Sequence, residues 1–363
     1  MSKDIFPLRI AQIAPLGERV PPEAYGGTER VVSALTDELV RLGHDVSLFA
    51  SGDSITSAKL YSVYPKALRG AKIHNPYGLN EWTLLNAGEA YRRQEEFDII
   101  HDHNYMSGIS MAQFAKTPTI MTIHSSFTPK NIQLLKFFDK PEIVTISKSQ
   151  GSMFPDLKIL STVYNGLALE NYLFSNKHDG YLLYVGRICM EKGLHLAIDV
   201  ANKLNLPLII AAKLDNADLE YFYSHIISRL DGERIKWIGE VDDQKRNELM
   251  SKAMCILHPV TWPEPFGLTM IESMATGCPV VALNQGSIPE VVRDKKTGFV
   301  VRDVEEMVEA VKKIDKIDRR VCRAYALKNF NSNIMAKKYL DVYYGLIKSQ
   351  KKPISYLTNY SSL

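Results

Sequence analysis

Two glutamates, Glu264 and Glu272, mark the ends of a segment whose residue types suit an anion flanked by hydroxyl groups. The segment joins a predicted apolar strand at 254–257 to a predicted amphipathic helix. Gly267 lets the backbone approach a ligand closely, and the free N–H groups at a helix start attract an anion. The two carboxylates can accept hydrogen bonds from hydroxyls. A nucleotide-sugar, with phosphates between two polyols, has this chemistry.

A second candidate phosphate site is the run 186–193, which follows the first predicted strand of the second half of the chain. Arg187 supplies a planar fork of donors and Lys192 a compact ammonium, and both complement a diphosphate. Alone, the run could be a polar turn with a structural Gly193. Because 264–272 lies downstream in the same predicted domain, we favour phosphate binding.

These two segments resemble the G-R-x4-K-G and E-x7-E motifs of the family-4 retaining glycosyltransferases, which have the GT-B fold. The resemblance implies that Arg187 and Lys192 hold the donor phosphates. It implies that Glu264 contacts hydroxyls of the transferred sugar and that Glu272 accepts hydrogen bonds from the ribose. Backbone groups of the second motif would meet the phosphates, and Gly239, a looser match, would lie near the base. The implied donor-binding residues of this half are Arg187, Lys192, Gly239, Glu264, Phe266, Gly267, Leu268, Thr269 and Glu272.

In the first half, Gly26 and Gly27 precede a predicted helix at 28–42. Adjacent glycines permit positive φ and close approach to a ligand, and Thr28 suits an N-cap. The resembled family often has a Gly-Gly-x-Glu-like turn here that faces the donor, although a plain tight turn is the alternative. The G-x-G-x-x-G fingerprint is absent, which counts against an ordinary dinucleotide-dependent dehydrogenase.

His124 ends the predicted strand 119–123, and so should lie at the edge of a sheet. In the resembled family, a histidine at this place hydrogen-bonds the transferred sugar near the reacting carbon; a structural histidine is the alternative. The predicted catalytic residues are His124, Arg187, Lys192 and Glu264.

The run His101-Asp102-His103 could suggest a metal site, but two histidines and one carboxylate are a weak signal. We favour acceptor-side or structural roles for His101, His103 and Asn104. The chain has no Asp-x-Asp, the pairing that metal-dependent glycosyltransferases use. Arg187, Lys192 and the helix start at Gly267 can supply positive charge instead, so we expect neither a metal nor another cofactor.

Short apolar runs alternate with amphipathic stretches along the chain. Predicted strands are 8–14, 45–50, 98–101, 119–123 and 142–146, then 181–185, 208–212, 234–238, 254–258 and 280–283. Strands alternating with helices form parallel sheets. We predict an α/β protein of GT-B class, with two doubly wound, Rossmann-like domains whose sheets face each other across a cleft. The domains should be 1–170, on the acceptor side, and 171–334, which binds the nucleotide-sugar, with a joint within 165–179. A C-terminal helix, about 335–363, should return to the first domain.

The formal net charge of +3 gives no argument for a nucleic-acid partner. Residues 312–352 hold 12 basic and 3 acidic residues, which indicates either a solvated helical face or contact with an anionic lipid surface. No signal peptide or membrane span is recognisable, and the four cysteines form no C-x-x-C pair. We expect a cytoplasmic protein, with peripheral contact at the inner membrane face as the alternative.

The resemblance implies metal-independent, retaining transfer of a hexosyl unit from a UDP- or GDP-sugar to a glycan, lipid or small-molecule acceptor. Alternatives on the same fold are a sugar-nucleotide 2-epimerase, a phosphorylase and a non-catalytic nucleotide-sugar-binding protein. Paired carboxylates also occur in glycoside hydrolases, but there a cation pair suited to a diphosphate would have no purpose. Neither the acceptor nor the oligomeric state is readable from the sequence.

Overall fold

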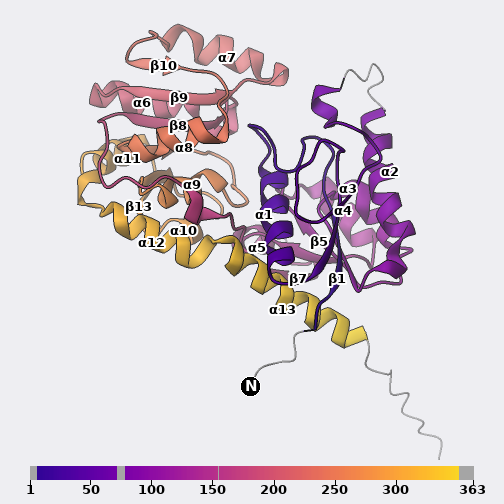
Figure 1. Cartoon of the computed structure of the whole chain (residues 1–363). Helices are drawn as coiled ribbons and strands as arrows, with labels where there is room; N and C mark the ends of the chain where they lie inside the picture. The colour runs from indigo at the N-terminus through magenta and orange to yellow at the C-terminus, as the bar shows by residue number, and fades with distance from the viewer. Residues whose placement is uncertain (1–5, 72–77, 154, 351–363) are drawn as a thin grey trace, which may run out of the picture.

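The computed structural model describes residues 6–71, 78–153 and 155–350, and they form two α/β domains (Figure 1). The N-terminal domain has a seven-stranded parallel sheet of order β3-β2-β1-β4-β5-β6-β7. Its strands are β1 (Arg9–Ile13), β2 (Asp45–Phe49), β3 (Lys59–Tyr61), β4 (Ile99–Asp102), β5 (Thr119–Ile123), β6 (Glu142–Thr145) and β7 (Ile159–Thr162). Its helices are α1 (Gly27–Arg41), α2 (Gly78–Arg92), α3 (Met106–Ala112), α4 (Pro129–Phe137) and α5 (Lys148–Ser152).

The C-terminal domain has a six-stranded parallel sheet of order β10-β9-β8-β11-β12-β13. Its strands are β8 (Leu182–Arg187), β9 (Leu208–Lys213), β10 (Ile235–Trp237), β11 (Cys255–His258), β12 (Val280–Leu283) and β13 (Gly298–Val301). Its helices are α6 (Leu194–Leu204), α7 (Leu219–His225), α8 (Asp243–Lys252), α9 (Leu268–Ala275), α10 (Ile288–Val291), α11 (Val304–Val311) and α12 (Arg319–Phe330). Two parallel sheets with helices around them confirm the predicted fold class.

Strand burial explains which elements the sequence reveals. The inner strands β4, β5, β11 and β12 are buried at every residue, because helices cover both faces of a parallel sheet. Such strands appear as apolar runs, and all were predicted. The strands β3, β7 and β13 were not predicted. Each lies at the edge of its sheet and is only partly buried, and the short sequences of β3 and β7 mix polar and apolar residues.

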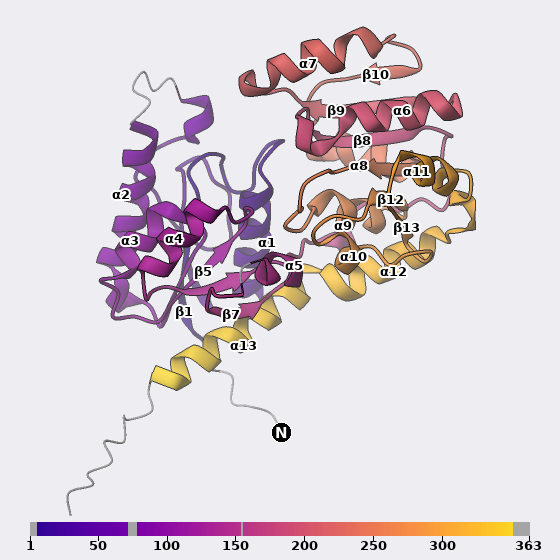
Figure 2. The same ribbon diagram turned by 180° about the vertical axis from the view of Figure 1, so that it is seen from behind.

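The last helix, α13 (Ser332–Gln350), returns from the C-terminal domain to the N-terminal one. Figure 1 and Figure 2 both show α12 beside the C-terminal domain and α13 beneath the N-terminal sheet. Leu167, after β7, hydrogen-bonds Phe330 and Ser332, so the two segments that cross between domains lie side by side. Tyr339 and Tyr343 of α13 are fully buried, and α13 contacts α1.

Two arginines of the basic stretch 312–352 make hydrogen bonds within the protein. Arg319 is buried and donates to the backbone carbonyls of Ser175, Ser251 and Ala253. Arg323 likewise donates to backbone carbonyls, among them that of Ala275. These guanidiniums hold α12 against the domain. No helix among the described residues is long and apolar enough to cross a membrane.

Candidate functional site

A cavity of about 490 Å³ lies between the domains, where the carboxyl ends of the strands meet. The N-terminal domain contributes the start of α1 and the residue after β5. The C-terminal domain contributes the end of β8 and the loop that leads into α9. A smaller cavity of about 130 Å³ shares part of this lining and extends toward α8. Of the predicted residues, the larger cavity is lined by Gly26, Gly27, His124, Arg187, Lys192, Glu264, Phe266, Gly267, Leu268 and Thr269, and the smaller one by Glu272.

Lys192 and Glu264 form an ion pair at one end of the cleft. Lys192 Nζ lies 2.5 Å from Glu264 Oε2, and Trp262 Nε1 donates to the same oxygen at 3.0 Å. Glu264 is buried, which by itself would raise the pKa of its carboxyl. The charge of Lys192 and the two hydrogen bonds outweigh burial and lower the Glu264 pKa below its usual value. The carboxylate is therefore ionised and held in place.

Glycines shape the backbone on both sides of this pair. Gly193 has a φ of 68°, and a Cβ there would lie 2.0 Å from the carbonyl oxygen of Pro259. Gly267, the N-cap of α9, has a φ of 80°, and a Cβ there would lie 2.6 Å from Met270 Cε. The positive φ favours glycine at both positions, and at Gly193 the backbone of Pro259 also leaves no room for a Cβ. The first N–H groups of α9, which have no partner within the helix, start at the cavity wall.

Arg187, at the end of β8, lies beside the cavity with its Nε 3.4 Å from Asp218 Oδ2. Two side chains that line the cavity have a buried polar atom without a hydrogen-bond partner. These atoms are His258 Nε2 and Asn165 Oδ1. Neither residue was predicted. Unpaired buried polar atoms are costly, so both are suited to a ligand group.

Glu272 has a separate set of partners at the other end of the cleft. Arg246 donates to Glu272 Oε1 at 2.8 Å, and the Tyr172 hydroxyl donates to the same oxygen at 3.0 Å. Only 3% of Glu272 is exposed. Burial would raise the pKa of Glu272, but the charges of Arg246 and Arg30 lower it below its usual value. The sequence reasoning missed these partners, because α8 and the Tyr172 loop carry no motif.

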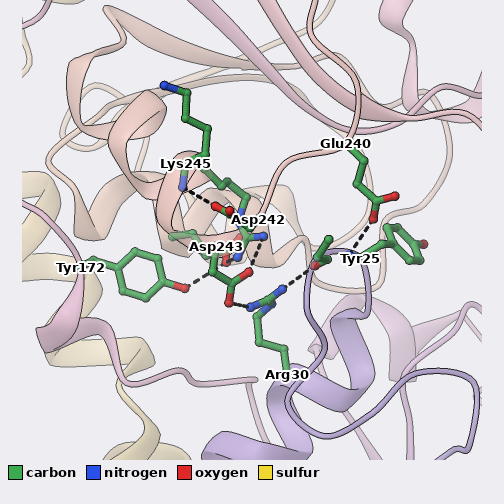
Figure 3. A network of polar contacts seen from close by, with 10 residues as sticks. Tyr25, Arg30, Tyr172, Glu240, Asp242, Asp243 and Lys245 are labelled. Carbon is green, nitrogen blue, oxygen red and sulfur yellow. Dashed lines mark hydrogen bonds and ion pairs between the residues drawn. The ribbon is translucent and has the colours of Figure 1, made fainter. Parts of the chain in front are cut away.

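Two polar contacts join the domains near α8, one made by Arg30 with Asp243 and one by Tyr25 with Glu240 (Figure 3). Arg30 of α1 forms an ion pair with Asp243 at the start of α8. The backbone N–H of Tyr25 donates to Glu240 Oε1 at 2.9 Å. Gly239 precedes this glutamate, and its carbonyl accepts from Ala212 N–H, so Gly239 itself is part of the sheet edge. The Tyr25 loop is thus held against the C-terminal domain.

The start of α1 differs in detail from the prediction. The N-cap is Gly26, with a φ of 144°, so Thr28 lies inside the helix and the expectation that it caps α1 is wrong. A Cβ at Gly26 would lie 2.7 Å from Pro22 Cβ, so the preceding loop folds tightly over the helix start. A Cβ at Gly27 would contact Leu268 of the other domain at 3.5 Å. Gly27 therefore stands where the domains approach each other.

Glu29, the glutamate of the Gly-Gly-x-Glu-like turn, is a buried carboxyl at the cavity wall, and burial raises its pKa from 4.5 to about 7. The folded chain therefore keeps this proton to higher pH than the unfolded chain does. Stability from protonated Glu29 is fully present below pH 4.5 and is lost as the pH rises through 7. Relative to Glu29→Gln, we expect the wild type to lose on the order of 3 kcal/mol of unfolding free energy between pH 4.5 and 8. Urea unfolding of both proteins across this range measures the difference, and parallel curves would contradict the buried, protonated state.

His101, within β4, and His103, directly after it, lie inside the domain. His101 is fully buried and His103 is 4% exposed, and their ring nitrogens contact protein side chains. Because α13 covers this part of the sheet, the burial of both residues fits the structural alternative better than contact with an acceptor. Asn104 follows them, and its backbone N–H donates to Asp102 Oδ1 at 2.7 Å. Within the ranges that the structure describes, no three His, Cys, Asp or Glu side chains gather as a metal site.

Two family models match the chain. "Glycosyl transferases group 1" matches residues 169–328 and "Glycosyltransferase Family 4" matches residues 25–156. An uncharacterised glycosyltransferase of Methanocaldococcus jannaschii is 26% identical over 343 residues, which cover 80% of this chain and 85% of the relative.

Solved structures resemble the whole two-domain arrangement. Sucrose-phosphate synthase from Thermosynechococcus elongatus has a TM-score of 0.78 at 17% identity, covering 94% of this chain and 99% of its own. The Anabaena protein HepE, solved with UDP and glucose, has a TM-score of 0.72 at 18% identity, covering 93% and 100%. This similarity confirms the predicted GT-B fold.

Proposed function

The chain belongs to the family-4 glycosyltransferases, and from this premise we propose that it transfers a hexosyl unit from a UDP- or GDP-sugar with retention of anomeric configuration. The acceptor would be a glycan, lipid or small molecule that enters from the N-terminal domain. One observation carries the proposal: two buried, ionised carboxylates, Glu264 and Glu272, lie in adjoining cavities that also contain Arg187 and Lys192. The HepE structure, with UDP and glucose, supports a nucleotide-sugar as the ligand class.

Each end of the cleft suits one part of such a donor. Arg187, Lys192 and the N–H groups at the start of α9 would bind the diphosphate, since cations and helix starts favour anions. Glu264 would accept hydrogen bonds from hydroxyls of the transferred sugar. Glu272, held by Arg246 and Tyr172, would accept those of the ribose.

We assign no protein nucleophile or general base to the transfer. The acceptor oxygen would bond to the anomeric carbon while the bond from that carbon to the phosphate oxygen breaks. The proton of the acceptor hydroxyl would pass to the departing diphosphate on the same face of the sugar. Arg187 and Lys192 would stabilise the charge that develops on the leaving group. His124 is neutral at physiological pH, because burial lowers its pKa to about 4.

Transfer should not need a divalent metal, because Arg187, Lys192 and the start of α9 provide positive charge where the diphosphate would lie. We expect EDTA to leave the rate of nucleotide release within about twofold, since no cation that acts at the leaving group would be removed. The assay compares protein with EDTA, protein with EDTA and excess Mg²⁺, and untreated protein. A loss that Mg²⁺ restores would contradict the expectation.

The reaction class is tested by incubating the protein with a panel of UDP- and GDP-sugars and candidate acceptors. Released nucleotide, donor-induced thermal stabilisation and the product are followed together. A new glycoside with the donor's anomeric configuration is the expected product. An isomerised nucleotide-sugar or a sugar phosphate would indicate the epimerase or phosphorylase, and binding without turnover would indicate a non-catalytic protein.

A further inference from the structure

The two hydrogen-bond donors that contact the Glu264 side chain both reach the same carboxylate oxygen. Glu264 Oε2 accepts from Lys192 Nζ at 2.5 Å and from Trp262 Nε1 at 3.0 Å. Glu264 Oε1 has no hydrogen-bond partner among the described residues, and it is not one of the unpaired polar atoms that the protein encloses. The carboxylate therefore has one oxygen bound to the protein and one oxygen open to the cavity that Glu264 lines.

The direction of both contacts is fixed by the chemistry of the groups. An indole N–H can only donate, and a lysine ammonium has three donors and no acceptor. The Glu264 carboxyl is ionised, because the charge of Lys192 and the two hydrogen bonds lower its pKa, and an ionised carboxylate can only accept. Unlike a hydroxyl or an amide, none of these groups can reverse its role, so the arrangement has a single reading.

Trp262 lies in a loop that is bound to the protein on both sides of the indole. The N–H of Thr261 donates to the carbonyl of Glu191 at 2.9 Å. The hydroxyl of Ser126, in the N-terminal domain, donates to the carbonyl of Pro263 at 3.2 Å. The indole is therefore a donor on a segment with fixed neighbours, whereas a lysine ammonium ends a flexible four-carbon stem.

Lys192 would have two tasks once a donor is bound. In the proposed function its ammonium stabilises the diphosphate, so its charge is then shared between the phosphate and Glu264. Trp262 has no second task of this kind, because an indole carries a single N–H. Its contact at Oε2 would keep the carboxylate ionised and oriented while Lys192 turns toward the phosphate. A buried carboxylate that loses its donors takes up a proton more readily.

We propose that Trp262 is a positioning residue, which holds the Glu264 carboxylate with Oε1 directed into the cleft, where this oxygen accepts a hydrogen bond from a hydroxyl of the bound ligand. That the hydroxyl belongs to the transferred sugar rests on the proposed function, whereas the orientation of Glu264 does not. Because Trp262 acts through Glu264, loss of its N–H should weaken the recognition of a ligand that carries the sugar and leave the bare nucleotide unaffected.

The contact is read directly by NMR of the full chain labelled with ¹⁵N-tryptophan, without ligand. The chain has three tryptophans, so three indole signals are expected, and Trp262→Phe identifies one of them. Replacing Glu264 by Gln should move the Trp262 indole proton upfield, since an amide oxygen is a weaker acceptor than a carboxylate. The Trp237 signal should stay in place, because its N–H donates to the Ala212 carbonyl. A Trp262 signal that also stays in place would overturn the inference.

Binding and turnover of Trp262→Phe test what this orientation does. Phenylalanine keeps an aromatic ring beside Lys192 Nζ, which lies 5.5 Å from the centre of the indole ring, but it has no N–H. We expect the Kd for UDP or GDP to stay within about twofold of the wild-type value, while kcat/KM for the nucleotide-sugar falls about tenfold, the effect of one hydrogen bond. The matched control is Trp82→Phe, with both values unchanged, because Trp82 packs on Tyr64 and does not line the cavity.

The outcomes separate this inference from the proposed function. If Trp262→Phe weakens the bare nucleotide as much as it lowers kcat/KM, the indole supports the whole site rather than one carboxylate, and the inference is wrong. An unchanged kcat/KM in an active protein would overturn it as well. The expected movement of the Trp262 signal in a protein that transfers no sugar would support the orientation of Glu264 and contradict only the proposed function.

Discussion

Replacing Lys192 by Met is expected to lower kcat/KM for sugar transfer by about a thousandfold while the chain stays folded. The substitution removes a cation from the place where the leaving diphosphate gains charge, and single groups of this kind contribute about 10²- to 10³-fold. It also leaves Glu264 buried without its ion pair, so the carboxyl should take up a proton and hold the sugar less well. Steady-state nucleotide release with the best donor of the panel measures the effect.

The control for this variant is Lys203→Met. Lys203 lies at the end of α6 and also forms an ion pair with a glutamate, Glu305, but on the exposed surface. Surface pairs contribute little, so this variant should keep its rate. If both variants retain activity, with thermal unfolding showing both folded, the phosphate role of Lys192 is wrong.

Replacing Glu272 by Gln is expected to weaken binding of UDP or GDP by about 10- to 100-fold. Glu272 is the buried acceptor at the ribose end, and a hydrogen bond to a charged group contributes about 1.5–3 kcal/mol. The fold should tolerate the change, because Arg246 keeps its contact with Asp243 at 2.9 Å. Calorimetric titration with each nucleotide gives the dissociation constants.

Glu306→Gln provides the comparison for Glu272→Gln. Glu306 on α11 also pairs with an arginine, Arg302, but both are at the surface away from the cleft. Its nucleotide affinity should equal that of the wild type. Equal affinity in Glu272→Gln as well would show that the ribose does not bind at Glu272.

The sequence was sufficient to predict the inner strands and the two loops that carry motifs, because each of these is specified by one short segment of the chain. The inner strands are apolar because both faces of the sheet are buried, and the loops after β8 and β11 carry their motifs in one continuous segment. Parallel topology then brings these loops to one edge of a sheet. The structure accordingly places Arg187, Lys192 and Glu264 around one cavity.

The remaining features depend on contacts between segments that are distant in sequence. Arg246 and Tyr172 meet Glu272 only when α8 and the loop after β7 pack beside α9, and neither segment has a distinctive spacing. The burial of His101 and His103 likewise follows from α13, more than 200 residues later, and no property of the strand itself indicates this cover. The burial of Glu29 was not predicted, because a glutamate in the first turn of a helix is ordinarily exposed.

The most direct test of the account is to locate a bound nucleotide in a crystal structure of the full chain with UDP, and in a second with GDP. The account predicts the diphosphate beside Arg187, Lys192 and the first turn of α9, with the ribose hydroxyls at Glu272. A nucleotide that binds outside this cleft, or fails to bind in both experiments, would contradict the account.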